Sequence, residues 1–249
     1  MMKKAWIKSA SALAMLLSAP LCMAAEAVHW AYDGEAAPAH WGELAPEFAA
    51  CGAGKNQSPV NVSGELKAAL PKLRFSYTTA VTEVLNNGHT IQANFAPGST
   101  LRLGDHSFEL KQVHFHAPSE NTIHGKQFPL EGHLVHQGQD GRLAVVAVMF
   151  KPGKAQSGLA RIWQQMPEAA NTKQAFDGKL LAGELLPRKR DYYYFSGSLT
   201  TPPCSEGVSW IVLKQAVESS DEQVNHFSHV MHHPNNRPVQ PLNSRIVIN

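Results

Sequence analysis

Short runs of alternating apolar and polar residues dominate the pattern along the chain. They cover residues 90–95, 107–117, 132–136, 143–150 and 209–214, and clusters of Gly, Pro and Asn separate them. Successive side chains of a strand point to opposite faces, so a period of two predicts strands with one buried face. The breakers between the runs predict turns. We therefore expect a sheet-rich, mainly β protein.

Two segments show instead the spacing of apolar positions that is typical of a helix. The first begins near Ser157, which we expect to be its cap, and stops at Pro167. The second begins at Ser220, which forms a capping-box pattern with Gln223. Both are predicted to be packing helices and not functional sites.

The amino terminus has the three-part pattern of a secretory signal peptide. Lys3, Lys4 and Lys8 precede an apolar stretch over about 10–21, and small residues follow it at 23–25. The stretch is too short to favour a membrane span in the mature protein. We expect a signal peptide at 1–24 and a single domain at 25–249.

Composition and charge fit an exported globular protein and give no support for nucleic-acid binding. Of the 249 residues, 43% are hydrophobic and 17% charged, which is enough to bury a sizeable core. The 22 basic residues outnumber 20 acidic ones only through the three signal lysines, since without them 19 basic residues face 20 acidic ones. No stripe of Lys and Arg follows that would indicate a nucleic-acid partner.

Two cysteines, Cys51 and Cys204, remain once the predicted signal peptide with Cys22 is removed. An even pair in an oxidising compartment favours one disulfide, and two separate buried thiols are the alternative. Export itself favours the periplasm as the location, with secretion to the medium as the second choice.

The stretch QVHFHAPSE, residues 112–120, places two histidines one residue apart on a predicted strand. A period of two predicts one face with Leu110, Gln112, His114 and His116, and the opposite face with Val113 and Phe115. Side chains two residues apart are about 7 Å apart at their backbones, so two imidazoles can converge on one ion. Alone, the pair also fits an ordinary polar strand face.

A second predicted strand, LEGHLVH at 130–136, repeats the arrangement. Glu131 and His133 share a face there, and His136 points the other way. Three neutral imidazoles with one open position describe a catalytic zinc site, whereas a structural zinc usually has four protein ligands. Gln112 and Glu131 each precede a histidine by two residues, where they can accept the free ring N–H and fix the tautomer.

Five separated motifs, QVHFHAPSEN, EGHLVH, NNGH at 86–89, NQSPVN at 56–61 and GSLTTPPCSEGVSWIVL at 197–213, together resemble an α-class carbonic anhydrase of the exported bacterial type. The motifs occur in family order from about Trp30 to the end of the chain. The resemblance implies a large twisted, predominantly antiparallel central sheet with a few short peripheral helices. It also implies a zinc enzyme that catalyses the reversible hydration of CO2 to bicarbonate and a proton.

The resemblance further implies roles for individual residues. His114, His116 and His133 match the ligands of one Zn²⁺ ion, whose bound hydroxide attacks CO2. Thr200 matches the gatekeeper hydroxyl that orients this hydroxide. Glu120 matches the carboxylate that orients Thr200, because an ionised carboxylate can only accept a hydrogen bond.

Two further groups follow from the same resemblance. His89 matches a proton shuttle, and an unperturbed imidazole pKa near 6.5 suits that task, although a surface histidine without a role is the alternative. An apolar substrate site is implied for Val135, Val145, Leu199, Thr201, Val208 and Trp210. Each apolar member, taken singly, also fits an ordinary core position.

The chain departs from the family pattern at three positions near the site. Asn121 follows Glu120 where many members have a histidine, Ala117 stands where a tryptophan often follows the second ligand, and Phe195 stands where some members have a tyrosine. We expect these departures to affect the polarity of the site and the rate, and not the ligand set.

Two alternative functions remain open on the sequence. His114, His116 and Glu120 also satisfy the first metal motif of cupins, in which the glutamate binds iron or manganese, but no second cupin motif follows. A carbonic-anhydrase-like fold could instead be a non-catalytic binding module. The expected partners of the enzyme are CO2, bicarbonate and water, sulfonamides as inhibitors, and a second copy in a hypothetical homodimer.

Overall fold

The computed structural model describes residues 1–2 and 28–249. The predicted signal peptide and its cleavage site lie outside the described residues, apart from the first two. Within the described ranges, no helix is long and apolar enough to cross a membrane.

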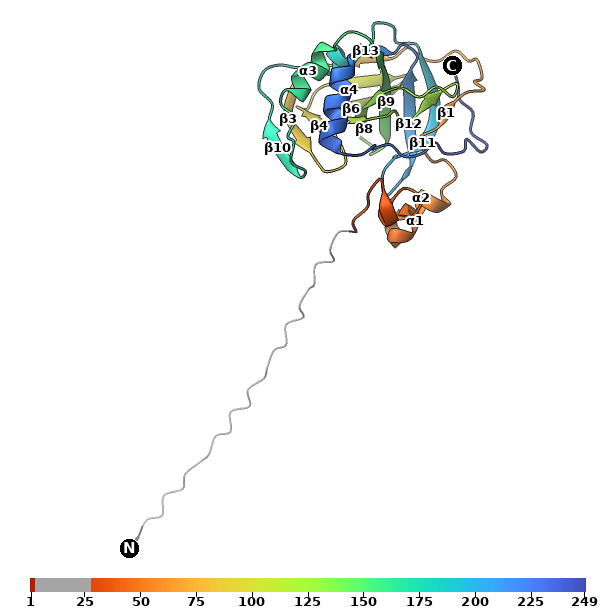
Figure 1. Cartoon of the computed structure of the whole chain (residues 1–249). Coiled ribbons are helices and arrows are strands. Elements are labelled where there is room, and N and C mark those ends of the chain that lie inside the picture. Colours follow the sequence, from red (N-terminus) through yellow and green to blue (C-terminus); the bar gives the residue numbers. More distant parts are fainter. Residues whose placement is uncertain (3–27) are drawn as a thin grey trace.

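The predicted central sheet is present, and eleven strands form it in the described part of the chain (Figure 1). Eight strands follow the order β10-β3-β4-β6-β8-β9-β12-β11, with β13 beside β9 and β5 joining β2 to β6. The pairs are antiparallel except where β12 and β13 run parallel to β9. The strands are β2 (Arg74–Ser76), β3 (Val81–Asn86), β4 (Ile91–Phe95), β5 (Thr100–Leu103), β6 (His106–His116), β8 (Leu130–Gly138), β9 (Leu143–Pro152), β10 (Thr172–Ala175), β11 (Tyr192–Ser198), β12 (Glu206–Leu213) and β13 (Val217–Ser219). A separate parallel pair joins β1 (Asn61–Val62) to β7 (Thr122–Ile123). The mainly antiparallel sheet expected from the sequence is therefore confirmed.

The helices are short and lie at the periphery, as expected. They are α1 (Trp41–Leu44), α2 (Ala50–Ala53), α3 (Ser157–Trp163) and α4 (Asp221–Met231), with 3₁₀ turns at Gly34–Ala36, Pro46–Phe48 and Ala182–Leu185. The capping box of α4 is confirmed, because the Ser220 hydroxyl accepts the Gln223 N–H at 3.3 Å. The predicted cap of α3 is wrong by one residue. The backbone is extended at Gln156, whose Oε1 accepts the Leu159 N–H at 2.6 Å, while Ser157 is already helical.

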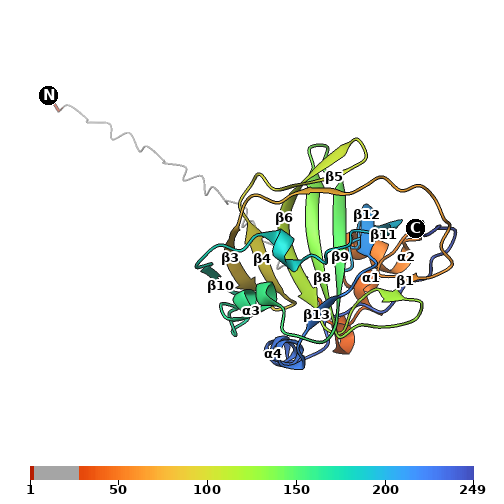
Figure 2. The same cartoon turned by 90° about the horizontal axis from the view of Figure 1, so that it is seen from above.

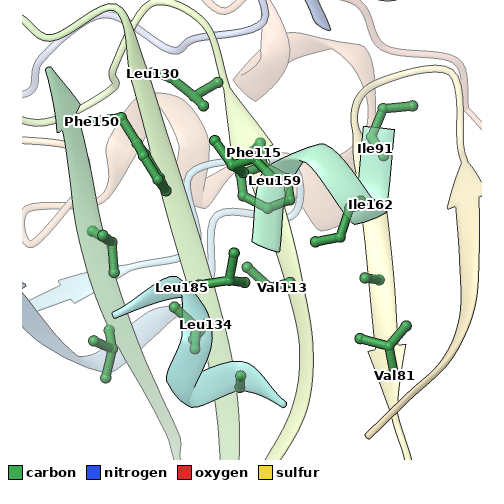
Figure 3. Packing of buried hydrophobic residues seen from close by; sticks show 14 of the residues in the cluster. Val81, Ile91, Val113, Phe115, Leu130, Leu134, Phe150, Leu159, Ile162 and Leu185 are labelled. Atoms are coloured by element: carbon green, nitrogen blue, oxygen red, sulfur yellow. The ribbon is translucent and has the colours of Figure 1, made fainter. Parts of the chain in front are cut away.

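One face of the sheet packs against α3 and α4 (Figure 2). Figure 3 shows the buried apolar side chains there, among them Val113 and Phe115 of β6 with Leu159 and Ile162 of α3. Leu110 belongs to this cluster as well, which corrects the prediction that it shares a face with Gln112. A bulge between Leu110 and Gln112 inserts one residue into β6 and shifts the alternation.

The opposite face of the sheet carries a second apolar cluster, formed mainly by β9, β11 and β12. Val145, Val208 and Trp210 are buried in it, and Val135 and Leu199 pack against it. His114, His116 and His133 lie on this second face, because they alternate with Val113, Phe115 and Leu134 of the first cluster. The strand period therefore separates the helix-covered core from the polar site.

The amino-terminal segment is joined to the loop after β11 by a disulfide between Cys51 of α2 and Cys204. Trp41 of α1 is completely buried beside this bridge. In Figure 1, α1 and α2 lie at one end of β11 and β12. The predicted disulfide is thus present, and it brings the amino-terminal helices to the loop that contains Thr200.

His136 of β8 is buried on the helix-covered face, pointing away from the three other histidines. Its Nδ1 donates to the Ala144 carbonyl at 3.2 Å, so Nε2 is the acceptor for the Tyr77 hydroxyl at 2.6 Å. Burial lowers the pKa of His136 from 6.5 to about 4. Folding therefore holds this imidazole neutral.

This burial predicts a loss of stability in acid. The unfolded chain binds a proton at His136 near pH 6.5 while the folded chain resists until about pH 4, so the free energy of unfolding should fall by about 3 kcal/mol as the pH falls through that window. Urea unfolding of the wild type and of His136→Gln at pH 7.5 and 4.5 measures the difference. The variant should lose less stability between the two pH values, whereas replacement of the exposed His226 by Gln should change nothing. Equal acid losses in all three proteins would contradict the prediction.

Candidate active site

His114 and His116 of β6 lie next to His133 of β8, and His114 is paired directly with His133 across the two strands. The ring centroids are 5.1 Å apart for His114 and His116, 5.2 Å for His114 and His133, and 4.6 Å for His116 and His133. One nitrogen from each ring lies within 4.8 Å of the other two. The two strands thus bring together the three histidines that the sequence singles out.

The second nitrogen of each ring is held by an oxygen atom. His114 Nδ1 donates to Gln112 Oε1 at 2.9 Å, and His133 Nε2 donates to Glu131 Oε1 at 2.9 Å. His116 Nδ1 donates to the backbone carbonyl of Asn235 at 2.7 Å. With these protons placed outward, the inward nitrogens are His114 Nε2, His116 Nε2 and His133 Nδ1, each with a free lone pair.

The electrostatics of this cluster suit a metal ion. His116 Nε2 is buried and has no hydrogen-bond partner in the described part of the chain. Burial lowers the pKa of all three imidazoles, and for His114 and His133 the neighbouring histidines add to the effect. Neutral imidazoles that converge through their lone pairs are ligands for zinc, and three of them leave a fourth position open.

Glu131 is fully buried and accepts four hydrogen bonds. Its Oε2 accepts the backbone N–H groups of Glu120 at 2.7 Å and Asn121 at 2.8 Å. Its Oε1 accepts Nδ2 of Asn121 at 2.7 Å in addition to the His133 ring. Burial raises the pKa of Glu131 to about 7, and the bonds from Asn121 oppose that rise. Asn121 therefore acts as a hydrogen-bond donor to Glu131, through both its backbone and its side chain.

Glu120 is also buried, beside the histidines. Its Oε1 accepts the backbone N–H of Arg237 at 2.9 Å, and its Oε2 lies 3.5 Å from His116 Nε2 and 3.9 Å from His133 Nδ1. Burial raises the pKa of Glu120, and Arg237 and the side chain of Thr200 act in the opposite direction. Thr200 is 5% exposed, and its side chain lies close enough to Glu120 to lower the pKa of the carboxyl.

The apolar residues predicted to bind substrate lie together. Val145, Val208 and Trp210 are buried in the second cluster, with Val135 and Leu199 against it. The Trp210 ring lies edge-on to His133 at 4.9 Å, and Phe195 stacks on Trp210 at 6.0 Å. Thr201, next to Thr200, is half-buried. An apolar wall therefore borders the histidine cluster.

His89 lies in the turn between β3 and β4 and is half-buried. Its ring stacks on Trp30 with centroids 3.7 Å apart and planes 11° apart. Burial lowers its pKa, and the nearby His29 and His233 lower it further. The backbone of the turn is held by Asn87, whose Oδ1 accepts the His89 N–H at 2.9 Å.

The sequence matches the profile of eukaryotic-type carbonic anhydrases over residues 36–249, which is most of the chain. The chain belongs to the α-class carbonic anhydrase family. A carbonic anhydrase of Pectobacterium atrosepticum is 50% identical over 97% of this chain and 100% of its own length. One of Klebsiella pneumoniae is 49% identical over 89% and 91%. Among solved structures, the α-carbonic anhydrase of Thermovibrio ammonificans superposes with a TM-score of 0.88 at 46% identity and covers 90% of this chain and 100% of that one.

Membership of the carbonic anhydrase family decides between the functions left open by the sequence. The chain is an enzyme that catalyses the reversible hydration of CO2, and the expected fold and activity are both confirmed. A cupin is excluded because the fold and the relatives are those of carbonic anhydrases. A binding module is not supported either, since the bacterial relatives carry the enzyme's name.

Sequence reasoning missed two residues that contact this carbonic anhydrase site. The carbonyl of Asn235 accepts the His116 ring, and the backbone N–H of Arg237 donates to Glu120. Both residues lie in the segment PNNRPVQPLN, residues 234–243, and both contacts come from main-chain atoms. Main-chain contacts leave little trace in side-chain identity. The sequence feature that could have indicated this segment is Arg237, a single arginine in an otherwise uncharged stretch.

Proposed function

We propose that this enzyme hydrates CO2 at one zinc ion held by His114 Nε2, His116 Nε2 and His133 Nδ1. The observation that carries the proposal is the convergence of these three nitrogens within 4.8 Å, with the opposite nitrogen of each ring already bonded to an oxygen. A bound zinc ion would lower the pKa of a water molecule towards neutrality and so supply the nucleophile, an effect for which this enzyme family is itself the best-known case.

Three acceptors fix the imidazoles for this task. Gln112, Glu131 and the Asn235 carbonyl each hold a ring proton on the outward nitrogen. Outward protonation fixes the ring orientation and makes the inward nitrogen the better electron donor. In this proposal Asn121 supports the set indirectly, because its bonds to Glu131 fix the carboxylate that in turn holds His133.

Thr200 and Glu120 would orient the nucleophile. An ionised Glu120 can only accept hydrogen bonds, so the Thr200 hydroxyl must donate a hydrogen bond to the carboxylate. The Thr200 oxygen is then free to accept a hydrogen bond from the attacking oxygen, whose lone pair is left to face the substrate. The backbone N–H of Arg237 supports this direction, because it occupies Oε1 of Glu120 and leaves Oε2 facing the histidines.

CO2 has no charge and no hydrogen-bond donor, so an apolar surface beside the metal suits it. We assign this surface to Val135, Val145, Leu199, Thr201, Val208 and Trp210. The support is their common cluster and the contact of Trp210 with the His133 ring.

His89 would remove the proton that each turnover releases. Its lowered pKa keeps the ring neutral at pH 7, so a ring nitrogen can accept the proton. It is half-buried, and therefore can pass the proton on to buffer. Asn235 links this residue to the site, since Nδ2 of Asn235 donates to the His89 carbonyl at 3.0 Å.

We expect His89→Ala to lower kcat for CO2 hydration by about a hundredfold in dilute buffer, because water and buffer replace the imidazole poorly as proton acceptors. Stopped-flow hydration with increasing imidazole should restore most of the lost rate. Because the substitution leaves the CO2 site intact, kcat/KM should change little. A matched His226→Ala variant, altered at an exposed position of α4, should behave as the wild type. Unchanged kcat in dilute buffer would remove His89 from the proton path.

The remaining proposals concern inhibitors, location and assembly. The Thermovibrio ammonificans enzyme was solved in complex with sulfanilamide, and we propose that sulfonamides also inhibit this enzyme. We propose export to the periplasm, with residues 1–24 as signal peptide and 25–249 as a single catalytic domain. The Cys51–Cys204 disulfide supports an oxidising location. A homodimer stays a prediction.

The test of the proposed zinc site is the metal content of the purified mature protein, measured together with its CO2 hydration rate. One zinc per chain, with activity lost on chelation and regained with zinc, is the expected result. A sulfonamide should inhibit the reloaded enzyme. Full activity in a protein from which zinc has been removed would reject the proposal.

A further inference from the structure

Arg237 is a buried cation whose side chain contacts neutral oxygens. It is 1% exposed, in an irregular segment after α4. Its Nη1 donates to Gln57 Oε1 and to the Ser58 carbonyl, both at 2.8 Å, and its Nη2 donates to the Cys51 carbonyl at 2.8 Å. Burying a charge is costly unless its bonds are well satisfied. The guanidinium thus fixes three acceptors of the amino-terminal segment. Its burial costs free energy, and a role in the active site would explain why the charge is kept there.

The main chain of the same segment contacts the active site twice. The Arg237 N–H donates to Glu120 Oε1 at 2.9 Å, and the Asn235 carbonyl accepts the His116 ring at 2.7 Å. Asn235 Oδ1 also accepts the Ala117 N–H at 2.8 Å. Residues 235–237 belong to no helix or strand, and the backbone–backbone hydrogen bond that they make runs from the Asn235 N–H to the Ala117 carbonyl at 3.3 Å. Their other hydrogen bonds involve side chains.

A third connection joins the same anchor to the loop of Thr200. Gln57, which accepts from Arg237, donates through Nε2 to the Cys204 carbonyl at 3.0 Å. Cys204 is bonded to Cys51, whose carbonyl also accepts from Arg237. The Arg237 guanidinium therefore joins residues 235–237, which contact His116 and Glu120, to residues 51–58. Residues 51–58 are in turn bonded to Cys204, in the loop of Thr200.

We propose that Arg237 is a positioning residue for the reaction: its guanidinium clamps residues 235–237 against the amino-terminal segment and thereby orients the His116 ring and the Glu120 carboxylate. The inference rests on the proposed zinc site. It differs from a purely structural role, because loss of the clamp should loosen the metal as well as the fold. Loss of an outer partner of a metal ligand typically lowers metal affinity by about 10–100-fold.

The test compares Arg237→Met with Arg245→Met in the zinc-loaded enzyme. Arg245 is the control, half-buried where Arg237 is fully buried: its guanidinium also donates to three carbonyls, those of Ser196 at 3.1 Å, Pro241 at 2.8 Å and Leu242 at 3.1 Å. Both variants should melt at a lower temperature. Only Arg237→Met should release zinc to a chelator about tenfold faster, and only its cobalt-substituted form should show an altered visible spectrum. Equal zinc release from both variants would overturn the proposal.

Two further proteins keep the test decisive. If Arg237→Met does not fold, Gln57→Leu removes one acceptor of the guanidinium and should accelerate zinc release in the same direction by less; wild-type release from it would overturn the proposal. His114→Ala, measured alongside, separates the two hypotheses. If its zinc content and release match the wild type, the proposed zinc site is wrong, whereas a loss of zinc there with unchanged release from the Arg237 variant rejects only the positioning role.

Discussion

His114→Ala should abolish CO2 hydration, with a fall in kcat/KM of more than about a hundredfold, beyond what the loss of an outer partner usually costs. The substitution removes one of three converging nitrogens and leaves Gln112 Oε1 without its donor. The variant would retain two of the three imidazoles that the proposed zinc site requires. Stopped-flow hydration and the zinc content of the same samples measure both consequences.

A matched substitution distinguishes this effect from general damage. His226 lies on the exposed side of α4, and His226→Ala should keep both zinc and activity. Adding zinc in large excess to His114→Ala should restore little of the rate of CO2 hydration, because the third imidazole nitrogen is missing. Wild-type rates in a His114→Ala sample that retains one zinc would show that this residue is not a ligand.

Much of the sheet could be predicted because its strands obey the simple period of two. β8 and β9 are continuous, so Glu131 and His133 share the face that the alternation assigns to them. β6 is different at its centre, where the bulge moves Leu110 to the helix-covered core. A bulge adds one residue without a distinct sequence pattern, so alternation alone misplaced Leu110 and placed the three positions after it correctly.

The convergence of the three histidines was predictable for a related reason. His114 and His116 are local in sequence, and one strand pairing suffices to bring His133 opposite them. The outer contacts of Gln112 and Glu131 are equally local, each two residues from its histidine. Asn235 lies 119 residues from His116 and contributes a carbonyl that every residue possesses. Contacts of that kind depend on the tertiary fold and cannot be read from a pattern.

The arrangement separates two tasks between the two faces of the sheet. The helix-covered face holds its polar pair, His136 and Tyr77, neutral and satisfied, which serves stability. The other face leaves His116 Nε2 and Glu120 Oε2 buried without a hydrogen-bond partner in the described chain. Unsatisfied buried groups reduce stability unless a ligand or a substrate completes them. The apolar core on the opposite face therefore offsets the free-energy cost of these unsatisfied atoms.

Thr200→Ala should lower kcat/KM for CO2 hydration by about a hundredfold while zinc remains bound, since a misdirected nucleophile loses roughly that much rate. The Thr200 hydroxyl is expected to donate to Glu120 and to accept from the attacking oxygen, and alanine can do neither. Stopped-flow hydration of the zinc-loaded variant measures the loss. kcat and kcat/KM should fall together, because the interaction orients the reacting atoms and contributes little to substrate binding.

The conservative changes test the direction of these hydrogen bonds. Thr200→Ser retains the hydroxyl and should keep most of the activity, which separates the hydroxyl from the shape of the side chain. Glu120→Gln should behave like Thr200→Ala, because its oxygen would stay with the Arg237 N–H at Oε1 and its amide would offer a donor to Thr200 where an acceptor is required. The hydroxyl would then be turned the wrong way. If Glu120→Gln hydrates CO2 at the wild-type rate, the carboxylate does not orient Thr200, and another group must direct the nucleophile.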